Sequence, residues 1–269
     1  MKKIILITGA SSGFGKHTVE ECLKRGHTVI AGLRGGHERL KECYQQEIPS
    51  NLIPLNLHLD SPSMIDQALD GLNGKIDVLV NNAGFGVMGK VETLKTEELR
   101  RQFEVNFFSA TYLIEKLLPR LKESKGTIIN VSSILGLTTL PYTAAYSSSK
   151  HALDAYTEAL HIEAKSYGVK VALVEPGRFV TSFNKNTVLT HNSQFLSPLL
   201  KRKSLSGNPL RVARLIANLC ESESPSLHNV IGTDAWFLLG ITRFLPSFLK
   251  LHLTHAMSKV AGSAEHSGI

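Results

Sequence analysis

The segment Tyr146-Ser-Ser-Ser-Lys150 places a phenol and an amine four residues apart, on one face of an expected helix. Free tyrosine has a pKa of about 10 and exchanges protons poorly at neutral pH. A lysine charge about 5 Å away, at an effective dielectric constant of about 20, would favour the phenolate by roughly 3 kcal/mol, or about two pKa units. Such a pair can serve general acid–base catalysis, although a chance pair of surface residues has the same spacing.

Ser132 and Ser133 stand where the strand expected over residues 126–132 ends. A hydroxyl at that place can donate a hydrogen bond to a substrate oxygen as negative charge develops on it. A Ser-His-Asp hydrolase is not favoured, because the chain has no histidine obviously placed for one. The serine pair alone is weak evidence and depends on its neighbours for its meaning.

Three glycines, Gly9, Gly13 and Gly15, lie between the first expected strand and the first expected helix. Glycine lets the backbone turn tightly and approach a pyrophosphate, and the helix start offers free N–H groups and the positive end of its dipole. The spacing is G-x-x-x-G-x-G, which differs from the G-x-G-x-x-G dinucleotide fingerprint. The segment predicts a dinucleotide site, with a plain glycine turn as the alternative.

The end of the second expected strand, Leu33-Arg34, bears on the choice of cofactor. In dinucleotide-binding folds an acidic residue here binds the ribose 2′-hydroxyl, whereas an arginine accommodates a 2′-phosphate. Leu33 cannot bind a hydroxyl, and Arg34 can clamp a phosphate. Lys16 lies close by in the sequence and adds positive charge. The pattern favours NADP over NAD, with a surface arginine as the alternative.

These residues are spaced along an alternation of strands and helices. Most of the apolar runs are unbroken, which is typical of strands buried on both faces of a parallel sheet. We therefore predict an α/β fold with a single doubly wound, Rossmann-type parallel sheet and helices on both faces. Strands are expected over residues 3–8, 28–33, 52–59, 76–81, 126–132 and 169–175, and helices over 14–25, from 96 toward Pro119, over 144–167 and after Asn208-Pro209.

Two segments fall outside this alternation. Residues 178–207 have no clear periodicity, and a loop of this length in a compact domain is usually functional, so we expect a substrate loop or lid. The extension over 235–269 is rich in Trp, Phe and Leu. We expect it to close the substrate pocket or pack on another subunit, with contact to a membrane surface as the less favoured alternative.

Composition narrows the classes of protein. The 269 residues are 42% hydrophobic and 20% charged, which is enough for one large domain. Three scattered cysteines predict reduced thiols and a cytoplasmic location, with no metal site. No apolar stretch reaches the roughly 18 residues that span a bilayer. The net charge of +7 is spread along the chain, so we expect no nucleic-acid partner.

Taken together, the motifs resemble those of the short-chain dehydrogenase/reductase family, from the first strand to about Thr181. An Asn-Asn-Ala-Gly element begins at Asn81, the serine lies 13 residues before Tyr146, and a Pro-Gly element follows the sixth strand. The resemblance implies a catalytic tetrad of Asn106, Ser133, Tyr146 and Lys150. It implies cofactor contacts from Gly9, Ser11, Ser12, Gly13, Phe14, Gly15, Arg34, Asp60, Asn82, Ala83, Gly84, Tyr146, Lys150, Pro176, Gly177 and Thr181.

In this family, Ser133 would bind the substrate oxygen, Tyr146 would pass the proton and Lys150 would lower the tyrosine pKa and hold the ribose. Asn106 would support a water that carries protons from Lys150. Asp60 would contact the adenine, and Thr181 the nicotinamide carboxamide. Residues 146–181 resemble the hydroxysteroid and retinol dehydrogenase branch.

The resemblance implies an NADP-dependent oxidoreductase that transfers a hydride to or from a carbonyl or alcohol carbon. The substrate would be a small apolar molecule such as a steroid, a retinoid or an aliphatic ketone or aldehyde. The assembly would be a homodimer or homotetramer formed through the Asn106 and Tyr146 helices. A non-catalytic NADP-binding sensor on the same fold is the alternative. Candidate pocket residues are Phe183, Phe195, Leu196, Trp236, Phe237 and Leu238, each of which could instead belong to the core.

Overall fold

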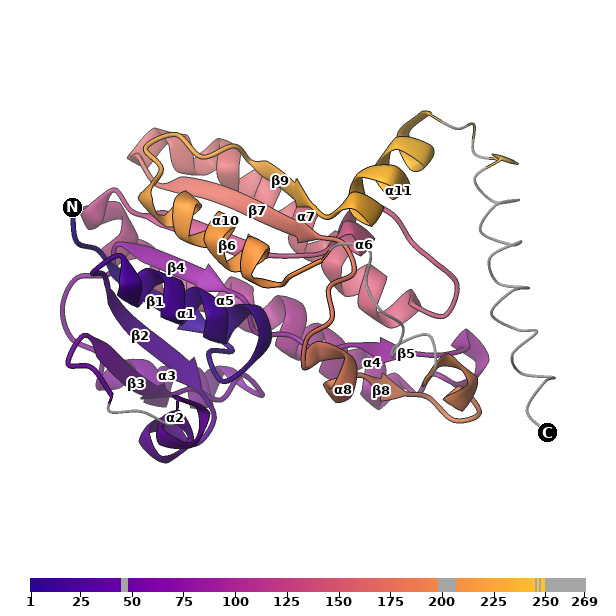
Figure 1. Cartoon of the computed structure of the whole chain (residues 1–269), viewed down its shortest axis with the longest axis horizontal. Helices are drawn as coiled ribbons and strands as arrows, with labels where there is room; N and C mark the ends of the chain where they lie inside the picture. Colours follow the sequence, from indigo (N-terminus) through magenta and orange to yellow (C-terminus); the bar gives the residue numbers. More distant parts are fainter. Residues whose placement is uncertain (45–47, 198–206, 245, 247, 250–269) are drawn as a thin grey trace.

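A computed structural model describes residues 1–44, 48–197, 207–244, 246, 248 and 249 of the chain. Its centre is a seven-stranded sheet in the order β3-β2-β1-β4-β6-β7-β9, in which every neighbouring pair is parallel (Figure 1). This order reverses beside β1, as expected for a doubly wound fold. The strands are β1 Ile4–Thr8, β2 Thr28–Leu33, β3 Leu52–Asn56, β4 Val78–Asn81, β6 Thr127–Val131, β7 Lys170–Pro176 and β9 His228–Ile231.

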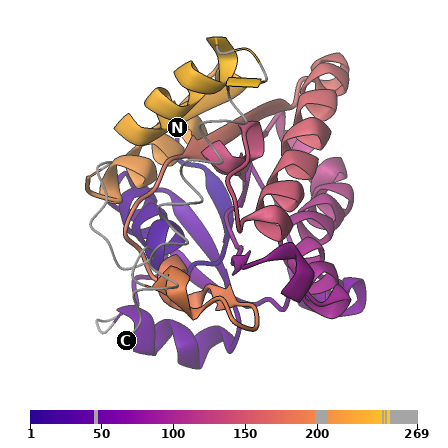
Figure 2. The same cartoon turned by 90° about the vertical axis from the view of Figure 1, so that its right-hand side faces the viewer.

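Helices cover both faces of the sheet, as predicted (Figure 2). One apolar cluster joins the sheet to α1 (Gly13–Lys24), α2 (Gly36–Tyr44) and α10 (Leu210–Glu221). The other joins it to α3 (Pro62–Asp70), α5 (Ser109–Ser124) and α7 (Ala144–Ala164). Because both faces are covered, the central strands are apolar throughout, and this is the origin of the unbroken runs in the sequence.

The helix expected to end near Pro119 is longer and more irregular than predicted. It comprises α4 (Thr96–Phe103), a π-helical turn η2 (Glu104–Phe108) and α5, which continues through Pro119 to Ser124. Proline removes one backbone hydrogen bond from a helix interior. The buried side chains of Leu117 and Leu121 on either side pack against the sheet, and this packing carries the helix past the proline.

Short elements near the carboxyl edge were not expected. The edge strand β9 is only partly buried, so its sequence lacks a strong apolar signal. The segment predicted as a loop contains α8 (Phe183–Asn186), β8 (Val188–Leu189) and a 3₁₀ turn, Gln194–Leu196. β8 pairs with β5 (Val87–Met88) in a second, two-stranded sheet. Residues 198–206 of the predicted lid lie outside the described residues.

The extension begins with α11 (Thr233–Phe244), which stands beyond the carboxyl edge of the sheet together with α6 (Ile134–Leu137) and α8 (Figure 1). Residues 250–269 of the extension lie outside the described part of the chain. Within the described part, no helix combines the length and the apolar character that crossing a bilayer requires.

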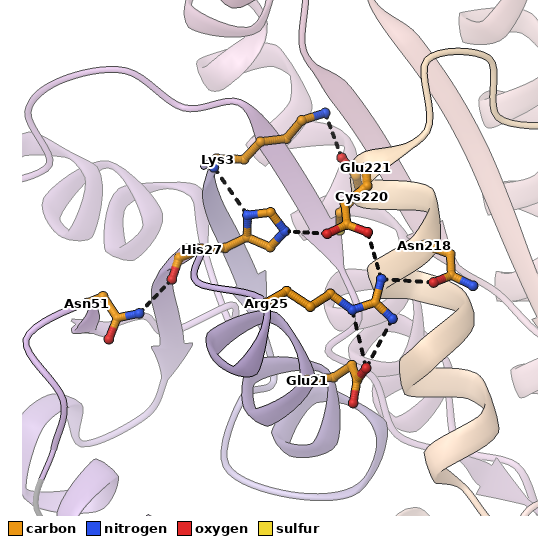
Figure 3. Close-up of polar contacts among 8 residues, drawn as sticks. All are labelled: Lys3, Glu21, Arg25, His27, Asn51, Asn218, Cys220 and Glu221. Carbon is orange, nitrogen blue, oxygen red and sulfur yellow. Dashed lines mark hydrogen bonds and ion pairs between the residues drawn. The ribbon is translucent and has the colours of Figure 1, made fainter. Parts of the chain in front are cut away.

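At the opposite edge of the sheet, a polar network joins the starts of β1 and β2 to the ends of α1 and α10 (Figure 3). The Lys3 backbone N–H donates to Nδ1 of buried His27, so Nε2 carries the proton that is donated to Glu221 at 3.0 Å. Arg25 donates to Glu21, Asn218 and Glu221. The network closes the amino edge of the sheet, away from the residues predicted to be functional.

Replacing His27 with alanine tests the importance of this network. His27→Ala removes the partner of the Lys3 N–H and one of the two partners of the Glu221 carboxylate, which keeps Arg25, so we expect the free energy of unfolding to fall by about 1–3 kcal/mol. The exposed pair of Arg39 and Glu42 offers a control, because Arg39→Ala should cost less than about 1 kcal/mol. Urea unfolding measures both variants, and equal destabilisation would contradict this interpretation.

Candidate active site

A cleft of about 1030 Å³ lies at the carboxyl ends of the strands. In open parallel sheets this is where ligands bind, because the loops that leave neighbouring strands diverge there. The predicted site residues come from eight different segments of the chain. All except Gly15 and Asn106 line the cleft, so the fold brings the tyrosine, the lysine and the glycine turn to one surface.

The glycine turn forms one end of the cleft. Gly9 and Gly13 have φ of +67° and +55°, a backbone conformation that favours glycine. Ser12 precedes α1, and its side chain makes no capping hydrogen bond. The first turn of α1 also contains no acidic residue. The free N–H groups and the helix dipole therefore face the cleft without a competing anion, which fits a pyrophosphate group.

Gly15 acts through packing and does not line the cleft. A Cβ atom at this position would collide with the backbone oxygen of Gly9 and the side-chain amide of Asn82. That amide donates to the Thr8 backbone oxygen at 2.8 Å, while Thr8 Oγ accepts from the N–H groups of Asn82 and Ala83. The Asn-Asn-Ala-Gly element thus locks β4 to the glycine turn and lets α1 begin close to it.

Arg34 and Asp60 line the cleft beyond the glycine turn and are exposed. Arg34 is therefore available to an anion on the ribose. Lys16, which the sequence suggested as a second cation, is directed elsewhere. Its Nζ donates to the Cys43 backbone oxygen at 2.6 Å and lies over the Tyr44 ring.

Tyr146 and Lys150 lie on α7, and Ser133 precedes the short helix α6. Tyr146 is only 7% exposed, and Lys150 Nζ lies 6.0 Å from the centre of its ring. Lys150 Nζ also donates to the Val131 backbone oxygen at 2.8 Å. Ser133 Oγ accepts from the Leu135 N–H at 3.1 Å. The three side chains meet where β6 ends, as the sequence predicted.

The pKa values differ from the sequence expectation. Burial raises the pKa of Tyr146 to about 12, although the hydrogen bond with Ser133 favours the phenolate. Burial lowers the pKa of Lys150 to about 8, and the negative charge of Asp154 opposes this effect. The prediction that Lys150 brings the tyrosine pKa toward neutrality is not met in the protein alone, where removal of water has the largest effect and raises this pKa.

Asn106 lies in the π-helical turn η2 and is buried behind the cleft. Its Oδ1 accepts from the Phe85 N–H at 3.1 Å, and its Nδ2 donates to the Phe85 oxygen and to Ser149 Oγ. A Cβ atom at Gly84 would lie 3.1 Å from Asn106 Oδ1 and 3.8 Å from Lys150 Nζ. Asn106 is therefore close to Lys150 but does not reach the cleft surface.

The outer part of the cleft is mostly apolar. Of the predicted pocket residues, Phe183, Phe237 and Leu238 line it, and the Phe183 ring lies 5.4 Å from that of Tyr146. The predictions for Phe195, Leu196 and Trp236 were wrong: Leu196 is buried elsewhere, and Trp236 is 61% exposed. Sequence reasoning missed a group of wall residues that no local motif marks, namely Phe85, Met88, Arg101, Val105, Leu140 and Val188.

Among the described residues no group of three or more His, Cys, Asp or Glu side chains could hold a metal ion. The groups that the cleft presents, a glycine turn, a basic side chain and a phenol–amine pair, suit a dinucleotide and a small oxygen-containing molecule.

Comparison with known proteins assigns the family. The model of the short chain dehydrogenase family matches residues 3–192. The chain belongs to the short-chain dehydrogenase family. It is 32% identical to 3-ketodihydrosphingosine reductase of Bacteroides thetaiotaomicron, with 86% of this chain and 88% of the relative covered. It is 31% identical to human retinol dehydrogenase 8, with 84% and 80% covered.

The fold of the family is also confirmed by solved structures. A short chain dehydrogenase from Burkholderia cenocepacia, solved in complex with NADP, has a TM-score of 0.71 and is 26% identical, with 94% of this chain and 96% of that chain covered. Members of this family bind NAD or NADP and act as oxidoreductases on CH–OH groups. The short-chain dehydrogenase described here is therefore an enzyme of that class.

The close approach at Gly15 leads to a testable expectation. Gly15→Ala should lower the free energy of unfolding by about 1–3 kcal/mol and weaken NADPH binding, because the new methyl group must push α1 away from Gly9. Gly71→Ala is the matched control, since nothing lies within 4 Å of a Cβ there and φ is −83°. Urea unfolding and fluorescence titration with NADPH measure the two effects. Unchanged binding in Gly15→Ala would contradict the assignment of the turn.

Proposed function

We propose that this enzyme is an NADP-dependent oxidoreductase that transfers a hydride between nicotinamide and a carbonyl or alcohol carbon of an apolar substrate. The observation that carries the proposal is the meeting of Ser133, Tyr146 and Lys150 on the wall of the cleft that also contains the glycine turn. Nothing in the comparisons favours a non-catalytic NADP-binding sensor.

In the proposed mechanism, Gly13 and its neighbours at the start of α1 bind the pyrophosphate. Bound NADPH would supply the hydride. Ser133 donates a hydrogen bond to the substrate oxygen, and Tyr146 donates the proton that this oxygen takes up. The raised pKa of Tyr146 keeps the phenol protonated near neutral pH, which is the form that carbonyl reduction requires.

Lys150 would hold the ribose and stabilise the phenolate that remains after proton transfer. Asn106 would support proton passage to and from Lys150, and its position beside Gly84 is compatible with this role. Asp60 would contact the adenine and Thr181 the carboxamide; both line the cleft. These roles are part of the proposal.

The substrate is proposed to be apolar, because aromatic and aliphatic side chains dominate the outer cleft. Phe183 lies beside the Tyr146 ring, and Phe237 brings α11 to the entrance. The names of the two relatives, a 3-keto reductase and a retinol dehydrogenase, support a ketone or alcohol substrate. We also propose that the extension closes the pocket, because its residues Phe237 and Leu238 line the cleft.

The preference for NADP rests on Arg34. Because β2 ends in Leu33 and not in an acidic residue, there is no carboxylate to bind the ribose hydroxyls or to repel a 2′-phosphate.

The assembly is proposed to be a homodimer or homotetramer through the faces of α5 and α7. Phe108, at the start of α5, is 50% exposed, and Ile162 on α7 is 70% exposed. The proposal also places the enzyme in the cytoplasm, and the unpaired state of its three cysteines is compatible with that location.

Tyr146→Phe tests the chemical role of the phenol. The variant keeps the ring and removes the proton, so we expect turnover of a carbonyl substrate to fall at least about 100-fold. NADPH affinity should change little. Tyr156→Phe, on the same helix, is the matched control and should keep full activity. A Tyr146→Phe enzyme with near-normal turnover would overturn the proposed function, and a panel of aldehydes, steroids, retinoids and aliphatic ketones provides the assay.

Arg34→Leu tests the cofactor preference. Loss of a charge-assisted hydrogen bond should raise KM for NADPH about 10- to 100-fold while KM for NADH stays nearly constant. Arg39→Leu removes a neighbouring surface charge and should leave the ratio of the two constants unchanged. Steady-state kinetics with NADPH and with NADH measure the two KM values. An equal rise in KM for NADH would contradict a role for Arg34 in phosphate recognition.

A further inference from the structure

A carboxyl group is buried behind the catalytic lysine. Asp154 lies on α7 four residues after Lys150, so the two side chains are neighbours on one face of the helix. Asp154 is 3% exposed, and among the described residues neither of its oxygens makes a hydrogen bond with good geometry. Ser132 Oγ, on the cleft wall beside Ser133, also lacks a well-placed partner there, but it is close enough to Asp154 to favour the ionised carboxylate.

The surroundings of Asp154 are tightly packed. A Cβ atom at Gly136 of α6 would collide with Asp154 Oδ2 and would lie 2.7 Å from Ser132 Oγ. A buried carboxyl without hydrogen bonds lowers the stability of a protein, and an apolar residue would fill the same space at less cost. A structural role alone therefore does not account for an aspartate at this position.

The ionisable groups that act on Asp154 come from three elements. Lys150 lies on its own helix, Glu175 on β7 and His228 on β9. The side chains of β6 and α6, which face the same space, are not ionisable. Asp154 in turn acts on Tyr146 as well as on Lys150. The buried carboxyl is thus influenced both by Lys150 and by a second pair of ionisable groups, Glu175 and His228.

That second pair leads to the surface. Glu175 is fully buried; its Oε1 lies 2.7 Å from His228 Nδ1, and its Oε2 accepts from the Asn229 N–H. His228 is 41% exposed and lies 3.8 Å from Glu158, which is 49% exposed. Tyr146, Lys150, Asp154 and Glu158 follow one another at intervals of four residues on α7. Ionisable groups are therefore spaced along one face of α7 from the cleft toward the solvent.

We propose that Asp154 is a positioning residue of the reaction, whose carboxylate holds Lys150 in its ammonium form and couples that charge to Glu175 and His228. This inference rests on the proposed roles of Tyr146 and Lys150. Asp154 does not touch the substrate. It acts by keeping the positive charge beside the phenol up to a higher pH than burial alone would allow.

The direction of the pKa shifts agrees with this arrangement. Burial raises the pKa of Asp154 to about 7, while Ser132, Lys150 and His228 favour its ionised form and Glu175 opposes it. Above that pH the carboxylate raises the pKa of Lys150 against the effect of burial. Without the carboxylate, Lys150 loses its proton at a lower pH, and the pKa of Tyr146 falls with it.

The test is the pH profile of kcat/KM for NADPH-dependent reduction by the full-length enzyme. Asp154→Asn should move the alkaline limb to lower pH by about one unit, which is about tenfold in rate at a fixed pH on that limb. Asp70→Asn removes an exposed carboxylate elsewhere and should leave the profile unchanged. Superimposable profiles of Asp154→Asn and the unmodified enzyme would overturn the proposal.

Ser132→Ala provides a second variant that keeps the carboxyl. Loss of the hydroxyl should raise the pKa of Asp154, so the alkaline limb should shift in the same direction as in Asp154→Asn but by less. In the protein without cofactor, infrared titration of the protonated carboxyl band should show a group with a midpoint near pH 7. The band should be lost in Asp154→Asn and appear at higher pH in Ser132→Ala; no such band would refute the proposal.

These outcomes are separate from those of the proposed function. An inactive Tyr146→Phe together with an unshifted Asp154→Asn profile refutes only the role of Asp154. An active Tyr146→Phe refutes the proposed function itself, whatever Asp154 does. A purely structural aspartate would change the unfolding midpoint of Asp154→Asn without moving its pH profile.

Discussion

The chemistry proposed for this enzyme depends on an amine held away from water. Lys150 is almost fully buried, and its Nζ has one backbone partner, the Val131 oxygen at 2.8 Å. Removal of water destabilises the charged forms of the lysine and of the tyrosine alike. Burial therefore lowers the pKa of Lys150 and raises the pKa of Tyr146. Any charge placed near the pair then acts in a medium of low dielectric constant and has a large effect. The fold must therefore control which charges come close.

Hydrogen bonds between the parallel sheet and α7 hold these groups in place. β4 and β6 are neighbours in register, with Asn81 opposite Asn130. Asn81 donates to Asn130 at 2.9 Å, and Asn130 donates to Thr157 at 2.8 Å, so buried amides tie both strands to α7. These bonds fix the helix that carries Tyr146 and Lys150 against β4, which leads to the Asn-Asn-Ala-Gly element, and β6, which leads to Ser133.

Stability and chemistry are placed at opposite edges of the same sheet. At the amino edge, the side chains of His27 and Arg25 both donate hydrogen bonds to Glu221 (Figure 3). At the carboxyl edge, Ser132 and Asp154 are buried without well-placed hydrogen-bond partners in the described part of the chain. A difference of this kind is expected when a site keeps polar groups for its chemistry and the rest of the fold supplies the stability.

The sequence alone determined the fold class and predicted the glycine turn and the polar residues of the proposed site, because these are encoded locally. Unbroken apolar runs indicated strands covered on two faces, and Gly9, Tyr146 and Lys150 had the spacing that a turn and one helix face require. The tertiary structure decided the properties that depend on distant neighbours. The edge strand β9, the pocket wall from Phe85 and Phe237, and the burial of Asp154 arise from segments far apart in the chain. The tertiary structure also decided the direction in which the pKa of Tyr146 shifts. Spacing along a helix reveals a nearby charge but not the loss of water around the tyrosine.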